Sequence, residues 1–255
     1  MATQQLFYPV FRNLFVPETP SWLANPEIWV YLFSLFLIGS SVMILFGKNK
    51  NVPLILGLVF IILFLIAHVP YRLSQDLNNL GVWTIAIKCL TFAGGAFVAA
   101  GCMSSAQAEN VNSAWVSFSD TLTPVGALLF SLMLIAFGTD HFLYTTGVSR
   151  LVPEWIPFKV FWTYFSAVAL IGSGTAILFR IRPQLIAILA GIMILIWVFV
   201  LHLPGALAEP ETGSSHALTS TFHALGFSGI AFMVAGLLRQ KPEVLSYKRV
   251  FGGKK

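Results

Sequence analysis

The feature that most constrains this chain is a series of long apolar runs. About 20 helical residues, rising 1.5 Å each, cross a hydrocarbon layer of roughly 30 Å. Barrel strands would instead show short alternating segments. With 57% hydrophobic and only 10% charged residues, the sequence predicts an all-α integral membrane protein. The seven predicted transmembrane helices are Ile28 to Phe46, Val52 to Val69, Trp83 to Met103, Leu122 to Tyr144, Lys159 to Phe179, Gln184 to Leu203 and Ala217 to Leu238.

Basic residues predict the orientation of these spans. They concentrate in the connections 47–51 and 180–183 and in the tail from Arg239, which alternating spans place on one side. The opposite side receives only Arg12, Arg72, Arg150 and Lys159. Because basic residues favour the cytoplasmic side, we expect the N-terminus outside and the C-terminus inside. We interpret the net charge of +5 as topology signals and lipid headgroup contacts, not as a nucleic-acid surface.

The sequence also repeats itself. At an offset of 133, eleven identities fall within 27 positions, from Pro20 and Pro153 to Phe46 and Phe179. At 134, Gly57, His68 and Pro70 meet Gly191, His202 and Pro204, and at 135 seven residues from Thr84 to Gly101 match Thr219 to Gly236. Equivalent spans are four crossings apart, so the copies have the same orientation and form a parallel repeat.

The repeat unit has four helices, and the first copy lacks the counterpart of the span Leu122 to Tyr144. Its remnant is short and rich in proline, and we expect it to lie at the outer interface, with Trp22 as an aromatic anchor. A misplaced start of the sequence is the competing explanation. The predicted organisation is a first repeat at 1–103, a linker loop at 104–121, a second repeat at 122–238 and a basic cytoplasmic tail at 239–255.

Six titratable side chains at the outer ends of the spans are the candidate site residues. His68 and His202 precede an X-Pro sequence that should end a helix. Lys88 and His223 are equivalent in the repeat, and Asp140 and His141 end the first span of the second copy. Since ionisable groups at membrane depth usually face the bundle interior or water, we expect one outward-facing polar pocket in each copy. Helix-end capping or snorkelling at the interface is the alternative interpretation.

Three kinds of ligand fit these residues. A metal could use Asp140, His141, His202 and His223, but adjacent helical residues point about 100° apart, which disfavours joint ligation by Asp140 and His141. A haem could use His202 and His223 as axial ligands, although both lie at the membrane edge. A quinone, lipid headgroup or small anion needs only one or two donors and an apolar cleft, and it ranks first.

Three stretches of the sequence resemble the DoxX-like membrane proteins of bacteria. They are FGTDHFLYTTGVSRLVPEWIPFKVFWTYFSAVALIGSGTAILF, then HLPGALAEP followed by FHALGFSGIAFMVAG, and IKCLTFAGGAFVAAG in the first copy. The resemblance implies four-helix bundles, a location in the bacterial inner membrane, and a role in membrane redox or export processes. The family's name derives from a thiosulfate:quinone oxidoreductase subunit. This chain departs from the family in being doubled, in lacking one helix, and in having His223 where lysine is commoner.

From the residues and the resemblance together, we expect outward-facing pockets that bind a lipid-soluble small molecule or quinone. The alternatives are a membrane subunit of a quinone-linked oxidoreductase, with Lys88 or His223 holding the quinone head and His141 or His202 relaying protons, and a small transporter. Expected partners are membrane lipids, a second copy of the chain or a redox protein.

Overall fold

The structure is a computed structural model that describes residues 1–47, 49, 51–75, 77, 79–103, 113–208 and 216–245. Within these residues every regular element is helical, and seven helices are long and apolar enough to cross a membrane. Both predictions are confirmed, and the chain is a multi-pass membrane protein. The elements are α1 (Ala2–Phe7), α2 (Pro26–Leu45), α3 (Asn51–Leu63), η1 (Phe64–His68), α4 (Val69–Leu73), α5 (Leu80–Met103), α6 (Ser113–Leu143), α7 (Thr145–Ser149), α8 (Lys159–Leu178), α9 (Pro183–Trp197), η2 (Val198–His202), α10 (Leu203–Ala208) and α11 (His216–Gln240).

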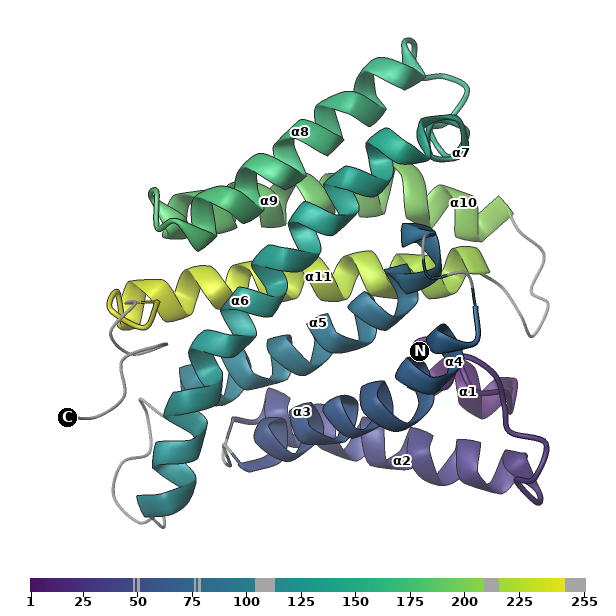
Figure 1. Ribbon diagram of the computed structural model, residues 1–255, viewed down its shortest axis with the longest axis vertical. Helices are drawn as coiled ribbons and strands as arrows, with labels where there is room; N and C mark the ends of the chain where they lie inside the picture. The colour runs from purple at the N-terminus through teal and green to yellow at the C-terminus, as the bar shows by residue number, and fades with distance from the viewer. Residues whose placement is uncertain are drawn as a thin grey trace.

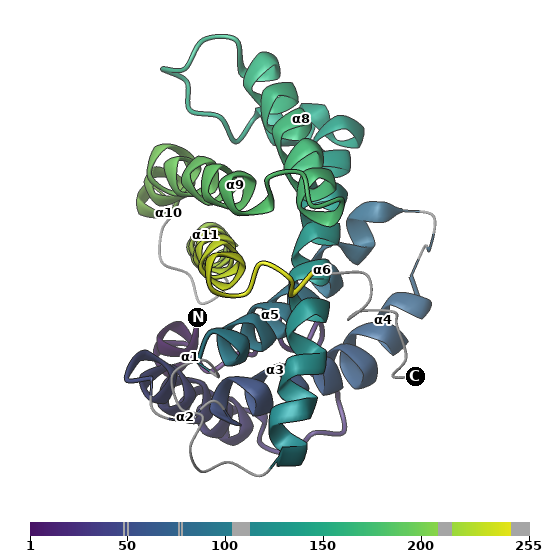
Figure 2. The same cartoon turned by 90° about the vertical axis from the view of Figure 1, so that its left-hand side faces the viewer.

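The spanning helices form a bundle with α5 and α11 in its middle. Helices α8 and α9 lie on one side of this pair and α2 and α3 on the other, while α6 crosses diagonally in front (Figure 1). Seen end-on, α11 lies between α9 and α5 (Figure 2). Helices α5 and α11 are also the two spans most buried by protein. The outer helices expose large apolar side chains, as lipid-facing helices do.

Close approach of α5 and α6 depends on two glycines. A Cβ at Gly94 would lie 2.9 Å from the carbonyl oxygen of Gly126, and one at Gly126 would collide with the backbone of Gly94. Small residues allow helix backbones to approach this closely in membranes. The contact fixes α6 against α5, and α6 in turn packs along α8.

The same local geometry occurs twice along the chain. Helices α2 and α8 each have 20 residues, and each follows a residue with a left-handed backbone, Asn25 (φ 48°) and Phe158 (φ 57°). A Cβ at Gly57 would collide with the ring of Phe97, and one at Gly191 with the ring of Phe232. Each pair is separated from its equivalent by the offsets found in the sequence.

The prediction that His68 and His202 end their helices was wrong. In both places the chain forms a π-helical turn, η1 and η2, and then continues as α4 or α10 through the proline. A proline ring clashes with the carbonyl four residues earlier in a regular α-helix, and the wider turn relieves this clash. The span therefore reaches beyond Pro70 and Pro204.

The predicted linker loop at 104–121 is partly wrong as well. Residues 104–112 lie outside the described part of the chain, but α6 already begins at Ser113. Thr121 and Thr123 donate their hydroxyl groups to the carbonyl oxygens of Ser117 and Ser119, which allows polar residues to remain helical. In the predicted basic tail, 246–255 likewise lie outside the described residues, as do Lys48 and Lys50 in the connection 47–51.

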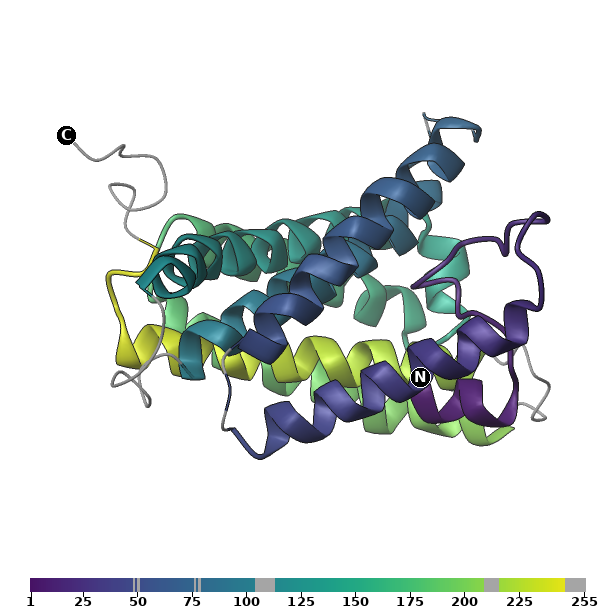
Figure 3. The same ribbon diagram turned by 90° about the horizontal axis from the view of Figure 1, so that it is seen from below.

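The N-terminal segment, which we expected to lie at the outer interface, is packed into the helix bundle. Gln5 and Leu14 are fully buried, and the Gln5 amide donates to the Ser34 hydroxyl on α2 at 2.9 Å. Viewed from below, α1 and the chain that follows it lie at one end of the bundle, and α11 ends at the other (Figure 3). The segment packs into the bundle because it carries large apolar side chains and satisfies its polar groups internally.

Candidate functional site

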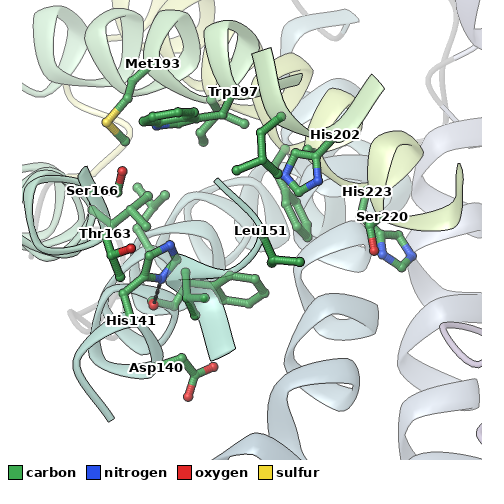
Figure 4. Close-up of a pocket in the computed structure, with 18 of the residues that line it drawn as sticks. Asp140, His141, Leu151, Thr163, Ser166, Met193, Trp197, His202, Ser220 and His223 are labelled. Atoms are coloured by element: carbon green, nitrogen blue, oxygen red, sulfur yellow. Dashed lines mark hydrogen bonds between the residues drawn. The ribbon is translucent and has the colours of Figure 1, made fainter. Parts of the chain in front are cut away.

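A cavity of about 410 Å³ lies among the helices of the second half, 122–238. Helices α6, α8, α9 and α11 form most of its wall, α5 contributes two residues, and the chain from Val148 to Val152 lies at one side. It is lined by five of the six candidate residues: Lys88, Asp140, His141, His202 and His223. These residues come from α5, α6, η2 and α11, so the fold collects them from four elements. Figure 4 shows Asp140 and the three histidines.

Among the residues that the structure describes, Lys88 and Asp140 are the two charged ones that line this cavity. The Lys88 ammonium lies 5.4 Å from the centroid of the Phe137 ring, a cation–π distance. One Asp140 oxygen accepts the Thr84 hydroxyl at 2.9 Å, and its other oxygen is buried without a hydrogen-bond partner among the described residues. One ammonium and one carboxylate leave the cavity close to electrically neutral.

All three histidines line the cavity. His141 Nδ1 donates to the Phe137 carbonyl at 2.7 Å, which leaves Nε2 as the acceptor nitrogen in the neutral ring. His202 and His223 lie near each other, across the cavity from His141 (Figure 4). The His202 carbonyl accepts the Thr221 hydroxyl at 3.0 Å, which ties the π-helical turn to α11.

His223 has the most unusual surroundings of the three. It is only 5% exposed, and neither ring nitrogen has a hydrogen-bond partner within the described chain. Its ring packs beside those of Phe92 and Phe227, with centroids 6.1 and 6.4 Å away. Leaving a buried polar group unpaired costs about 1–3 kcal/mol. His223 therefore lowers the folding stability of the protein when no ligand is bound.

The rest of the lining is mostly apolar. Met133, Leu134 and Leu170 line the cavity deeper along α6 and α8, and Met133 is about 16 Å from Tyr144 at the end of α6. Trp162 and Trp197 form part of the wall at the lipid side. The cavity thus has a polar end near the helix termini and an apolar interior.

His68 lies elsewhere, and Lys88 is not in a pocket of the first half. His68 is fully buried, and its Nε2 donates to the Leu14 carbonyl at 2.9 Å. Lys88 and Thr84 are one helical turn apart on the face of α5 that meets the second half, so they line the same cavity as His223. The expectation of one separate pocket per copy does not describe this arrangement.

The equivalent space in the first half is filled by aromatic rings. Phe15 packs against Phe33 and Phe60, with centroids 5.0 and 5.9 Å away. In the repeat, Phe33 is equivalent to Ser166 and Phe60 to Ile194, both of which line the cavity. Smaller side chains therefore leave room in the second half where large ones leave none in the first.

Several residues that line the cavity were not among the candidate site residues. Thr84, Tyr144, Thr163 and Ser166 belong to the wall, as does Trp162, which packs edge-on against Trp197 at 6.2 Å. Thr163 and Ser166 are three residues apart and share one face of an otherwise apolar helix. That pattern was visible in the sequence and pointed inward.

The described residues contain no group of three or more His, Cys, Asp or Glu side chains placed to hold a metal ion. The histidines are spread around the cavity and do not converge on one point (Figure 4).

A family model described as a domain of unknown function, DUF8561, matches residues 130–224. The matched range runs from within α6 into α11 and includes Asp140, His141, His202 and His223. Lys88 and Thr84, contributed by α5, lie before it. No curated protein and no solved structure matches the chain.

Proposed function

We propose that this protein binds a lipid-soluble small molecule with an uncharged polar head, a quinone being the concrete case, in the cavity of its second half. The observation that carries the proposal is a polar cluster of Lys88, Asp140, His202 and His223 inside an otherwise apolar cavity formed by spanning helices. Ligand sites are typically apolar clefts with a few convergent polar groups.

The charge of the cavity favours an uncharged head over an anion. Lys88 and Asp140 offset each other, so an anionic head would meet a carboxylate as well as an ammonium. A quinone ring presents two carbonyl oxygens, and Lys88 and His223 are donors that can reach such acceptors. His223 would gain the hydrogen bond that no described residue supplies.

A second candidate function is that of a membrane subunit of a quinone-linked oxidoreductase. Reducing a quinone to a quinol takes up two electrons, which a redox partner protein would supply, and two protons. The polar end of the cavity holds a carboxylate and three imidazoles. Such groups can transfer protons at neutral pH. The polar residues lie near helix ends and not at mid-span, so the geometry gives transport no comparable support.

We also propose that the two halves are DoxX-like units in a bacterial inner membrane, with the N-terminus outside. The recurring π turns and left-handed residues before α2 and α8 support a duplicated unit. Arg180, Arg182, Arg239 and Lys241 lie at the end of the bundle where α8 and α11 terminate, which supports a cytoplasmic position for that end.

The proposed function is tested by titrating the purified protein with a benzoquinone that carries no side chain. We expect saturable one-to-one heat of binding by calorimetry, and an affinity about tenfold weaker in Lys88→Met, the effect of losing one hydrogen bond to a charged donor. Lys159→Met is the matched control, because Lys159 pairs with Glu154 on the surface at 2.6 Å. No saturable binding, or equal losses in both variants, would refute the proposal.

A further inference from the structure

An apolar groove runs along the lipid-facing side of α8 and α9. Its apolar side chains are well exposed, Ile196 being 53% exposed, and no charged residue lines it. Along α9 and η2 it extends from Leu189 to Val200, about 16 Å along the helix axis. The lining residues are Trp155, Ile156, Pro157, Phe158, Phe161, Trp162, Phe165, Leu189, Ile192, Met193, Ile196, Trp197 and Val200.

This groove and the polar cavity share a wall. Trp162, Met193 and Trp197 line both of them. The two indole rings meet edge-on, with centroids 6.2 Å apart, and they come from neighbouring helices. A layer one side chain thick therefore separates the cavity from the hydrocarbon of the bilayer.

We propose that the ligand is an amphiphile with a long apolar chain, that it enters sideways from the bilayer between α8 and α9 past Trp162 and Trp197, and that its chain remains in the groove. This inference rests on the proposed function, because the head group occupies the cavity. It adds the class of ligand and its route. The groove is occupied by the apolar tail of the bound amphiphile.

The distribution of polarity supports this placement. On α8, Thr163 and Ser166 face the cavity while Phe161 and Phe165 face the groove, so the helix separates a polar side from an apolar one. An amphiphile already dissolved in the bilayer meets the groove with its chain, and its head needs to pass only the shared wall to reach Lys88 and His223. The ligand therefore reaches the cavity from the bilayer without passing through water.

The described residues of the first half differ at the equivalent positions. The residue equivalent to Trp197 is Leu63, and the space behind it is filled by Phe15 and Phe33. In the second half, Trp162, Met193 and Trp197 line both the groove and the cavity, so the two adjoin.

The test compares a benzoquinone without a side chain and the same ring carrying a decyl chain, both bound to the purified full-length protein. Ile196→Trp fills the groove without touching the cavity, and Phe199→Trp places a tryptophan at an exposed position of η2 outside the groove. We expect the decyl chain to tighten binding by about tenfold or more, since each buried methylene contributes roughly 0.8 kcal/mol. Ile196→Trp should remove that gain and leave binding of the bare ring unchanged, and Phe199→Trp should keep both.

The outcomes separate the two proposals. If the bare ring binds but the chain adds nothing, or if Ile196→Trp leaves the gain intact, the groove proposal is overturned and the proposed function stands. If neither quinone binds the unaltered protein, both fail together. Retained binding of the bare ring by Ile196→Trp shows that this variant is folded.

Discussion

Two buried histidines in this protein have opposite relations to their surroundings. His68 is fully buried and donates a hydrogen bond to the Leu14 carbonyl, which fastens the N-terminal segment to the bundle. His223 is almost as buried, yet no described residue pairs with either of its ring nitrogens. The first has the environment of a structural residue, and the second has that of a residue retained for binding.

We predict that His223→Leu stabilises the protein while His68→Leu destabilises it. Leucine removes the cost of burying an unpaired imidazole at position 223, roughly 1–3 kcal/mol, whereas at position 68 it leaves the Leu14 carbonyl without its donor. Thermal unfolding in detergent should show a raised midpoint for the first variant and a lowered one for the second. A lower midpoint for His223→Leu would contradict this assignment.

At the scale of elements, the two π-helical turns place His68 and His202 at equivalent points of their spans. Each turn precedes a proline by one residue, Val69 or Leu203, and each is followed by another stretch of helix. Only the second turn lines the cavity, through Leu201 and His202. The π turn η2 therefore contributes to the cavity wall, whereas the equivalent turn η1 contributes to packing through His68.

Pro204→Ala is predicted to weaken binding of the bare benzoquinone by about tenfold. Without the proline ring a regular helix becomes allowed, and closing the π turn rotates the residues beyond it by about 100° relative to those before it, which displaces the polar groups of η2. The loss corresponds to about one hydrogen bond, ~1.4 kcal/mol. Calorimetric titration measures it, with Pro70→Ala as the control in the other half; equal effects of the two variants would argue against a role for η2.

The elements were more predictable than their ends. Apolar length predicts all seven spans because each must cross the same layer of hydrocarbon. The start of α6 was missed because polar residues whose hydroxyl groups bond to their own helix look like helix breakers in the sequence. The continuation of the helix past Pro70 and Pro204 was missed because the sequence does not show the wide turn that precedes each proline. Those features depend on backbone geometry that composition does not encode.

At the scale of the whole molecule, the two sequence repeats differ: aromatic side chains fill the space among the described residues of the first, and the second has a cavity. The polar residues were predictable singly, because titratable groups are rare in apolar spans. Their grouping was not, since Lys88 belongs to the first half but lies on the face of α5 that packs against α6 and α11. Only the packing between the halves brings Lys88 into the same cavity as its repeat equivalent, His223.

The proposed orientation predicts which end of the molecule faces outward. Starting from a variant with Cys89 and Cys102 changed to alanine, Glu154→Cys and Gln184→Cys place single exposed thiols at opposite ends of α8 and α9. In intact cells a membrane-impermeant maleimide should label the first, and the second only after permeabilisation. The reverse pattern would place the basic end outside and overturn the orientation.

The most direct test of the central claim is to locate a bound quinone on the chain. A benzoquinone bearing a photoreactive azide is irradiated with the purified protein, and the modified residues are identified by peptide mass spectrometry. We predict adducts on cavity residues such as Leu151, Met193 and Trp197, and their loss in Ser166→Phe, which installs the aromatic side chain of the filled half. Adducts confined to α2 and α3, or adducts that persist in Ser166→Phe, would contradict a ligand site in the second half.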